Sequence, residues 1–241
     1  MSLYLLTGAA RGIGLEIARQ LTSNSSTTVI AIVRTISHEL ADLEKQRPNL
    51  HIIISDLSSL DKIANIGIQL PTILRDRKIT HVINNAAIVA GPDSHPLALS
   101  AFDFTENMAI NVLAPAKVVE AALPFLSSDG IIVNITSGIA SLELVTNGTI
   151  PPNVTAYSIS KAALNMYTVH LAMHLKGKNR VVCLDPGHVK TRLGGNGASV
   201  ETSDSAKGVI AVVEGLSNDE VGDKETGRAR FLNFLGEEVP W

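Results

Sequence analysis

Tyr157 and Lys161 lie four residues apart in the segment 156–164, whose pattern predicts a helix. On a helix, residues at this spacing project from the same face. An ammonium beside a phenol favours the phenolate and lowers the pKa of the phenol from about 10, so Tyr157 would exchange protons near neutral pH. The pair predicts acid–base chemistry, although this spacing also arises often by chance.

The apolar run that ends at Ile135 is followed by two adjacent hydroxyl residues, Thr136 and Ser137. If the run is a buried strand, its carboxyl end lies at the same edge of a sheet as the helix that carries Tyr157. A hydroxyl at that edge could polarise a substrate carbonyl. Successive strand residues point to opposite sides, so only one hydroxyl can face the site. We predict Ser137, with Thr136 as the alternative.

A glycine-rich turn after the first apolar run predicts a nucleotide site. Gly8, Gly12 and Gly14 lead, through Ile13, into a predicted helix over 13–21. Glycines at such a strand-to-helix turn let the backbone approach a pyrophosphate and direct free helix N–H groups toward it. The spacing Thr-Gly-x-x-x-Gly-x-Gly departs from the commonest dinucleotide pattern, so a turn that binds nothing is the alternative.

Two arginines favour NADP over NAD as the nucleotide. Arg34 follows the second apolar run, where proteins that prefer NAD usually offer Asp or Glu to the ribose hydroxyls. Arg34 and Arg11 form a cationic pair suited to a 2′-phosphate, which a guanidinium binds through two hydrogen bonds. An ordinary exposed arginine is the alternative interpretation of Arg34.

The next two apolar runs end in groups that could complete the nucleotide site. Asp56 could hydrogen-bond the adenine amino group, and Leu57 could flank the adenine ring. Asn84 and Ala86 would place an amide and a small side chain beside the ribose, where a bulky group would collide. A plain polar turn is the alternative for this second segment.

Seven short β-branched or aliphatic runs recur along the chain, mostly separated by helical patterns. The predicted strands are Leu3–Leu6, Thr28–Val33, His51–Ile54, His81–Asn84, Gly130–Ile135, Arg180–Leu184 and Ala229–Leu232. Strands that are apolar on both faces and alternate with helices require a parallel sheet covered on both sides. We therefore predict an α/β fold, a single doubly wound Rossmann domain over residues 1–241, with a seven-stranded parallel sheet ordered 3-2-1-4-5-6-7.

Composition excludes several classes of protein. The net charge is −3 and the basic residues at 176–180 are isolated, so the sequence lacks the clustered positive charge that is typical of nucleic-acid-binding proteins. We find no apolar stretch of membrane-spanning length and no room for a signal peptide before the first strand, and we assign no metal site. Cys183 is the only cysteine, which excludes an intramolecular disulfide and favours a reducing compartment. We expect a cytoplasmic protein without a membrane or nucleic-acid partner.

Taken in order, these motifs resemble the short-chain dehydrogenase/reductase family over essentially the whole chain. The matching residues are Thr7, Gly8, Gly12, Gly14, Asp56, Asn84, Asn85, Ala86, Asn111, Ser137, Tyr157, Lys161, Pro186, Gly187, Val189 and Thr191. The resemblance implies a catalytic tetrad of Asn111, Ser137, Tyr157 and Lys161. It also implies that Lys161 binds the nicotinamide ribose and Thr191 the pyrophosphate or carboxamide side. The further cofactor-binding residues that it implies are Tyr157, Pro186, Gly187 and Val189.

Pro115 gives a physical reason for a role of Asn111. Proline has no N–H, so the Asn111 carbonyl loses its helical partner and the helix should kink there. The freed carbonyl could hold a water. We hypothesise a proton relay from Tyr157 through the ribose hydroxyl and Lys161 to this water. The alternative is that Pro115 merely bends the helix around the sheet.

Two segments are predicted to shape the substrate site. Ser137 and Tyr157 are 20 positions apart, a longer spacing than is usual in the family, so a loop within 138–155 would overhang the substrate. The segment 191–203 contains three glycines and could close as a lid, with an inert surface loop as the alternative. The candidate pocket residues are mostly apolar: Val89, Ile139, Val145, His188 and Leu193.

Together, these features favour an NADP-dependent oxidoreductase. It would pass hydride between NADPH and the carbonyl of a small, apolar aldehyde, ketone or diketone, with Tyr157 as acid or base. The alternatives are an NAD(P)-dependent alcohol dehydrogenase that works oxidatively and a non-catalytic nucleotide-binding redox sensor, which would not need the tetrad. The predicted helices Phe102–Leu126 and Ala156–Leu175 are apolar around much of their circumference, so we expect a homodimer or homotetramer.

Overall fold

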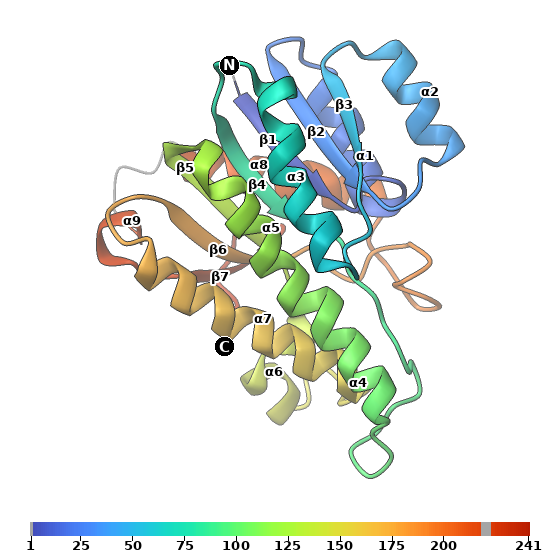
Figure 1. Cartoon of the computed structure of the whole chain (residues 1–241). Coiled ribbons are helices and arrows are strands. Elements are labelled where there is room, and N and C mark those ends of the chain that lie inside the picture. The colour runs from blue at the N-terminus through green and yellow to red at the C-terminus, as the bar shows by residue number, and fades with distance from the viewer. Residues whose placement is uncertain (1, 218–222) are drawn as a thin grey trace.

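One parallel sheet forms the frame of the molecule, for which a computed structural model describes residues 2–217 and 223–241. Its strands are β1 (Ser2–Thr7), β2 (Thr27–Val33), β3 (Leu50–Ile54), β4 (Ile79–Asn84), β5 (Leu126–Ile135), β6 (Arg180–Asp185) and β7 (Arg230–Asn233). They are ordered β3-β2-β1-β4-β5-β6-β7 and every neighbouring pair is parallel (Figure 1). The predicted order is confirmed. The predicted ends of some strands are not, most clearly in β5, which begins at Leu126 instead of Gly130.

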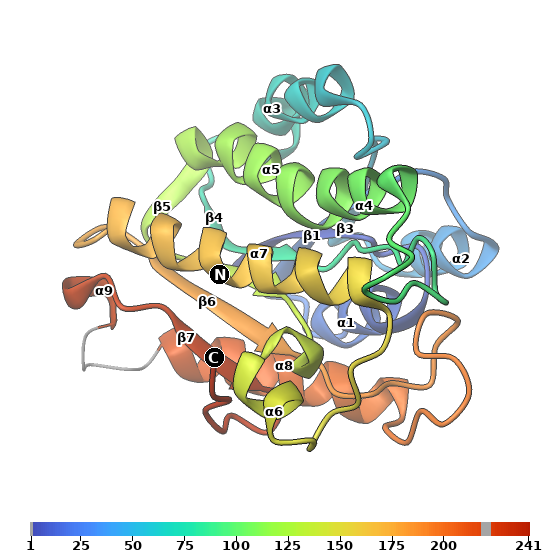
Figure 2. The same ribbon diagram turned by 90° about the horizontal axis from the view of Figure 1, so that it is seen from below.

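Helices cover both faces of this sheet. They are α1 (Gly12–Thr22), α2 (His38–Gln46), α3 (Leu60–Leu74), α4 (Ala101–Met108), α5 (Ala114–Ala122), α6 (Leu142–Thr146), α7 (Thr155–His174), α8 (Thr202–Ser217) and α9 (Asp223–Thr226). Figure 2 shows α3, α5 and α7 on one side of the sheet and α1 and α8 on the other. The predicted doubly wound arrangement is therefore confirmed.

Alternating side chains divide the interior into two apolar clusters. On β1, Tyr4 and Leu6 pack with α1, α2 and α8, whereas Leu3 and Leu5 pack with α3, α5 and α7. Every residue of β2 is buried, as expected for a central strand covered on both faces. This packing holds the carboxyl ends of the strands at one edge, where the predicted functional residues follow them.

A continuous helical segment runs from Ala101 to Phe125 through α4, a π-helical turn (Ala109–Leu113), α5 and a short 3-10 turn. Its length, together with a mean hydropathy of 1.4 over an 18-residue window within it, would be sufficient to cross a membrane by length and composition alone. The expectation that no stretch reaches this length is therefore wrong. In this fold the apolar side of α5 packs on the sheet, where Val118 and Val119 are buried, and core helices of soluble proteins meet the same criterion.

Helix α7 lies beside this segment and packs on α4 and the π-helical turn within the same chain (Figure 2). The predicted helix Ala156–Leu175 thus corresponds to α7, shifted by one residue. Its apolar circumference is partly covered by these contacts, whereas Met166 and Met173 remain 59% and 56% exposed. The expected interface between copies of the chain therefore has a smaller apolar surface available than the sequence pattern indicates.

Candidate active site

The glycine turn connects the end of β1 to the start of α1. Gly8 and Gly12 have φ values of +73° and +56°, a backbone region that favours glycine. The Thr7 hydroxyl oxygen accepts hydrogen bonds from the backbone N–H groups of Asn85 and Ala86, each 3.0 Å long. These bonds fasten the turn to the segment after β4. The sequence offered no separate signal for this role of Thr7.

The two predicted phosphate-binding arginines lie at neighbouring strand ends. Arg11 directly precedes α1, Arg34 directly follows β2, and both side chains are exposed. Asp56 follows β3, and hydrogen bonds from the N–H and hydroxyl of Ser58 lower the pKa of its carboxyl, with further lowering by Lys62 and Arg34. Arg34 therefore lies within electrostatic reach of Asp56.

The other residues predicted to contact the adenine and the pyrophosphate fall into two groups. Leu57 is half-buried and packs against the cluster under α3. After β6, Pro186 and Val189 are buried and Gly187 has a φ of +82°. Thr191 lies over the glycine turn, because a Cβ placed on Gly12 would be 3.3 Å from its Cγ2 atom. The structure thus brings the segment 186–191 next to the glycine turn.

The side chain of Asn84 is directed into the interior, which corrects the prediction that its amide lies beside the cofactor. It is 2% exposed, and its Nδ2 donates a 2.9 Å hydrogen bond to Oδ1 of Asn134. The Nδ2 of Asn134 in turn donates to the Thr168 hydroxyl at 2.8 Å. Asn84 is still part of β4, so its side chain follows the alternation of the strand, whereas Asn85 and Ala86 follow β4 and contact the turn.

Replacing Asn134 with leucine is expected to lower the free energy of unfolding by about 2–3 kcal/mol, because buried polar groups of Asn84 and Thr168 each lose a partner. Denaturant unfolding followed by circular dichroism measures the change. The matched control is Asn196→Leu at an exposed position, which should change stability by less than about 0.5 kcal/mol. Equal stabilities of the two variants would contradict this interpretation of the network.

Helix α7 presents Tyr157 and Lys161 on its buried face, as their spacing predicts. The Nζ atom of Lys161 lies 5.7 Å from the centroid of the Tyr157 ring and donates a 2.8 Å hydrogen bond to the carbonyl oxygen of Ile135. Burial lowers the pKa of Lys161 to about 8. The ammonium is therefore held between the phenol and the end of β5.

Burial raises the pKa of Tyr157, and the negative charge of Asp185 raises it further, while a hydrogen bond with Ser137 opposes both effects. The expectation that Lys161 lowers the pKa of Tyr157 is therefore wrong for this structure, since desolvation of the phenol is the larger effect. At neutral pH Tyr157 is a protonated phenol, suited to donate a proton. Asp185, the last residue of β6, is a neighbour of this site that no sequence motif predicted.

The end of β5 distinguishes between the two candidate hydroxyls. Thr136 is 2% exposed, and its hydroxyl donates a 3.5 Å hydrogen bond to the carbonyl of Lys161. Ser137 is half-buried and hydrogen-bonds to Tyr157. The structure thus selects Ser137 as the hydroxyl that faces the phenol.

Asn111 lies in the π-helical turn and connects three parts of the site. Its Oδ1 accepts a 2.9 Å hydrogen bond from the N–H of Ile88, and its Nδ2 donates 2.9 Å bonds to the Ile88 carbonyl and the Ser160 hydroxyl. The Ser160 hydroxyl donates to the Tyr157 carbonyl at 2.7 Å. Asn111 is fully buried, and through these hydrogen bonds its side chain positions α7 and the segment after β4. The proton relay through its carbonyl stays a prediction.

The π-helical turn just before Pro115 shows that the helix departs from regular α geometry where the sequence predicts a kink. The N–H of Ala114 bonds to the carbonyl of Ala109, five residues earlier. Proline offers no N–H at the next position, so a wider turn accommodates the missing α-helical bond.

The candidate pocket residues are distributed over three segments. Val89, Ile139 and Val145 are half-buried, whereas His188 and Leu193 are exposed. His188 Nε2 lies 2.8 Å from the Gly194 carbonyl oxygen, so the imidazole forms a hydrogen bond within its own loop. The segment 138–155 contains a 3-10 turn and α6 in addition to loop, and the segment 191–203 includes the start of α8, which limits the possible lid to about its first ten residues.

Comparisons with known proteins agree with this architecture. The sequence profile of the family described as short chain dehydrogenase matches residues 3–201. A protein named C-signal from Myxococcus xanthus is 35% identical over 142 residues, covering 58% of this chain and 79% of that protein. A short-chain dehydrogenase/reductase of Arthrinium sp is 32% identical over 204 residues, covering 79% of this chain and 76% of that protein. The NADPH-bound carbonyl reductase from chicken fatty liver has a TM-score of 0.85 at 28% identity, with 100% of both chains covered.

Proposed function

Because the chain belongs to the short-chain dehydrogenase/reductase family and is an oxidoreductase of carbonyl and alcohol groups, we propose that it reduces a small, apolar aldehyde, ketone or diketone with NADPH. The observation that carries this proposal is the buried Tyr157 phenol, hydrogen-bonded to Ser137 and adjacent to the Lys161 side chain. Ser137 holds the carbonyl oxygen, and Tyr157 protonates it as the carbonyl carbon is reduced.

The glycine turn fits a dinucleotide. A Cβ on Gly14 would lie 2.4 Å from the carbonyl oxygen of Gly8, so the start of α1 can pack this closely on the turn only because this position has no side chain. The first N–H groups of α1 would bind the pyrophosphate, and Lys161 would bind the nicotinamide ribose. NADPH supplies the hydride when it is bound.

We propose NADP rather than NAD on the basis of Arg11 and Arg34, and the carbonyl reductase from chicken fatty liver is a relative that holds NADPH. The test measures kcat/KM for NADPH and NADH with a panel of aldehydes, ketones, diketones and quinones. Arg34→Gln should lower kcat/KM for NADPH about 10- to 100-fold and leave the value for NADH nearly unchanged. Arg19→Gln, an exposed arginine on α1, is the control. Equal use of both cofactors by the wild-type chain would refute the preference.

The rate of reduction is expected to fall about tenfold per pH unit above pH 8. Below this pH Lys161, whose pKa is about 8, is protonated, and above it the ammonium beside Tyr157 is lost. Titration of Lys161 does not unfold the chain over this range. Its pKa is lower in the folded chain than in the unfolded chain, so the folded state loses the proton first and is stabilised as pH rises from about 8 to about 10.4. The loss of rate therefore does not come from unfolding caused by Lys161. A pH profile of kcat/KM that stays flat to about pH 10 would contradict the assigned role.

The oxidative direction is the main alternative, because the same groups catalyse both directions. Tyr157 would then accept the proton of an alcohol, and its raised pKa makes that role less favourable at neutral pH. A non-catalytic sensor would oxidise NADPH with none of the carbonyl compounds in the panel. The half-buried apolar side chains of Val89, Ile139 and Val145 support a small apolar substrate.

We also propose a cytoplasmic homodimer or homotetramer. The exposed apolar residues Ile159, Met166 and Met173 on α7 support an interface there. The sole cysteine, Cys183, is buried and suits a reducing compartment. Size-exclusion chromatography at micromolar concentration is expected to show a dimer or tetramer, and a monomer would overturn the assembly.

A further inference from the structure

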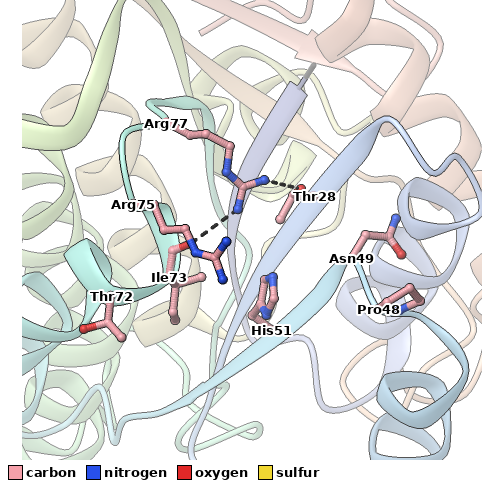
Figure 3. A pocket seen from close by; sticks show the side chains of 8 residues that line it. All are labelled: Thr28, Pro48, Asn49, His51, Thr72, Ile73, Arg75 and Arg77. Atoms are coloured by element: carbon pink, nitrogen blue, oxygen red, sulfur yellow. Dashed lines mark hydrogen bonds between the residues drawn. The ribbon is translucent and has the colours of Figure 1, made fainter.

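A cavity of about 500 Å³, whose lining side chains are shown in Figure 3, lies at the amino-terminal ends of β2 and β3. It is bordered by Thr28 at the start of β2, His51 at the start of β3, and the end of α3 with the turn that follows it. Because all strands are parallel, their amino-terminal ends are remote from the glycine turn and from Tyr157. The cavity is therefore separate from the cofactor and substrate regions.

Two guanidinium groups converge in this cavity. Arg77 is fixed by hydrogen bonds from its guanidinium to the Thr28 hydroxyl at 2.9 Å and to the Ile73 carbonyl at 3.3 Å. Arg75 is exposed, and Figure 3 shows its guanidinium directed toward the same cavity as the Arg77 guanidinium and the His51 ring. The lining residues include no Asp or Glu, so two positive charges share one concave surface without a lining carboxylate.

Burial and the positive charges of the cavity lower the pKa of the His51 imidazole. Burial lowers the pKa of His51, and Arg77 and Arg75 both lower it further, while the carboxylate of Glu44 acts in the opposite direction. Burial and the two arginines thus leave the imidazole in a site that disfavours additional positive charge. An anion placed between the arginines would reduce this repulsion.

The backbone of Arg75 adopts an energetically unfavourable conformation beside this cavity. Arg75 has φ +55° and ψ −117°, and among the described residues only Val154 is another non-glycine residue with positive φ. Such conformations cost about 1–3 kcal/mol and occur preferentially at ligand-binding and other functional positions. Here the conformation ends α3 and lets Arg75 and Arg77 project into the same cavity.

We propose that this cavity binds a small organic phosphate. Guanidinium groups match a phosphate dianion in charge and in the geometry of paired hydrogen bonds, so the phosphate would lie between Arg75 and Arg77. The cavity is larger than a phosphate group needs and lies in the size range of small-molecule sites. The apolar surfaces of Ile73 and Pro48 would contact the organic part of the ligand.

The test uses phenyl phosphate as the probe and the 241-residue chain saturated with NADP, so that the proposed cofactor site does not compete for phosphate. Isothermal titration calorimetry should show saturable binding, and the His51 ring signal in NMR spectra should shift during the titration. Phenol, which lacks the phosphate, should not bind. Inorganic phosphate should bind more weakly than phenyl phosphate, because it lacks the ring that would contact Ile73 and Pro48.

Arg75→Gln is the informative variant, since Arg75 is exposed while Arg77 also fastens Thr28. It should weaken phenyl phosphate binding at least about tenfold and abolish the His51 shift, with KM for NADPH unchanged. The charge-matched control Arg19→Gln should bind like the wild-type chain. The proposal is overturned if binding does not saturate below about 10 mM, or if Arg75→Gln binds as tightly as the control.

Discussion

Replacing Tyr157 with phenylalanine is expected to lower kcat for carbonyl reduction about 10³-fold and to leave KM for NADPH within about twofold of the wild-type value. The phenylalanine ring fills the same buried space on α7. The substitution removes only the hydroxyl that hydrogen-bonds to Ser137 and would protonate the carbonyl oxygen. Steady-state kinetics with NADPH and the best carbonyl substrate from the panel measure both constants.

Tyr167→Phe is the matched control for this substitution. Tyr167 is on the same helix, and burial raises its pKa to about 12, but it follows Tyr157 by ten positions and is not part of the predicted tetrad. Its variant should keep wild-type kcat. Near-normal turnover by Tyr157→Phe would show that another group donates the proton, and equal losses in both variants would point to a general effect on α7.

The sheet could be predicted from sequence because its order depends on patterns that are local in the chain. The run Thr28–Val33 is apolar on both faces, which requires covering helices on two sides, and β2 is buried throughout. The glycine turn fixes where the first strand ends and α1 begins. Strand ends were less predictable, since pairing with neighbours extends β5 back to Leu126 through polar residues that carry no strand pattern.

The electrostatics of the site could not be predicted from the same patterns. The spacing of Tyr157 and Lys161 predicted their shared helix face, but the pKa of Tyr157 depends on its burial and on Asp185, which comes from another element. The family resemblance named Asn111 without its contacts. Only the fold reveals that this amide joins Ile88 to Ser160.

Two further expectations from the sequence were wrong. No apolar stretch of membrane-spanning length was expected, yet the segment 101–125 contains one, and in the fold it contributes Val118 and Val119 to the core beside the sheet. Asn84 is a polar residue at a strand end, a place where cofactor contacts are expected, yet its amide bonds to Asn134 inside the protein. In both cases the position of a side chain relative to the sheet determines its role.

Replacing Gly14 with alanine is expected to weaken NADPH binding at least about 100-fold. The new Cβ would lie 2.4 Å from the carbonyl oxygen of Gly8 and 2.5 Å from Nδ2 of Asn85, distances that real Cβ atoms essentially never show. Asn85 cannot simply move away, because this Nδ2 donates a 3.0 Å hydrogen bond to the carbonyl of Thr7. The strand-to-helix turn must therefore shift, and with it the N–H groups that would face the pyrophosphate.

The matched control is Gly215→Ala on α8, where, among the described residues and apart from the neighbouring residues and the backbone of the same helix, no atom lies within 4 Å of the new Cβ. That change should leave NADPH binding unaltered and raise stability by about 0.5–1 kcal/mol, since alanine is the better helix former.

Overpacking at Gly14 costs about 1–3 kcal/mol, which corresponds to a melting temperature lower by several degrees rather than to an unfolded chain. NADPH fluorescence titration measures binding in the folded variants. If Gly14→Ala is folded and binds NADPH as tightly as Gly215→Ala, the glycine turn does not hold the cofactor.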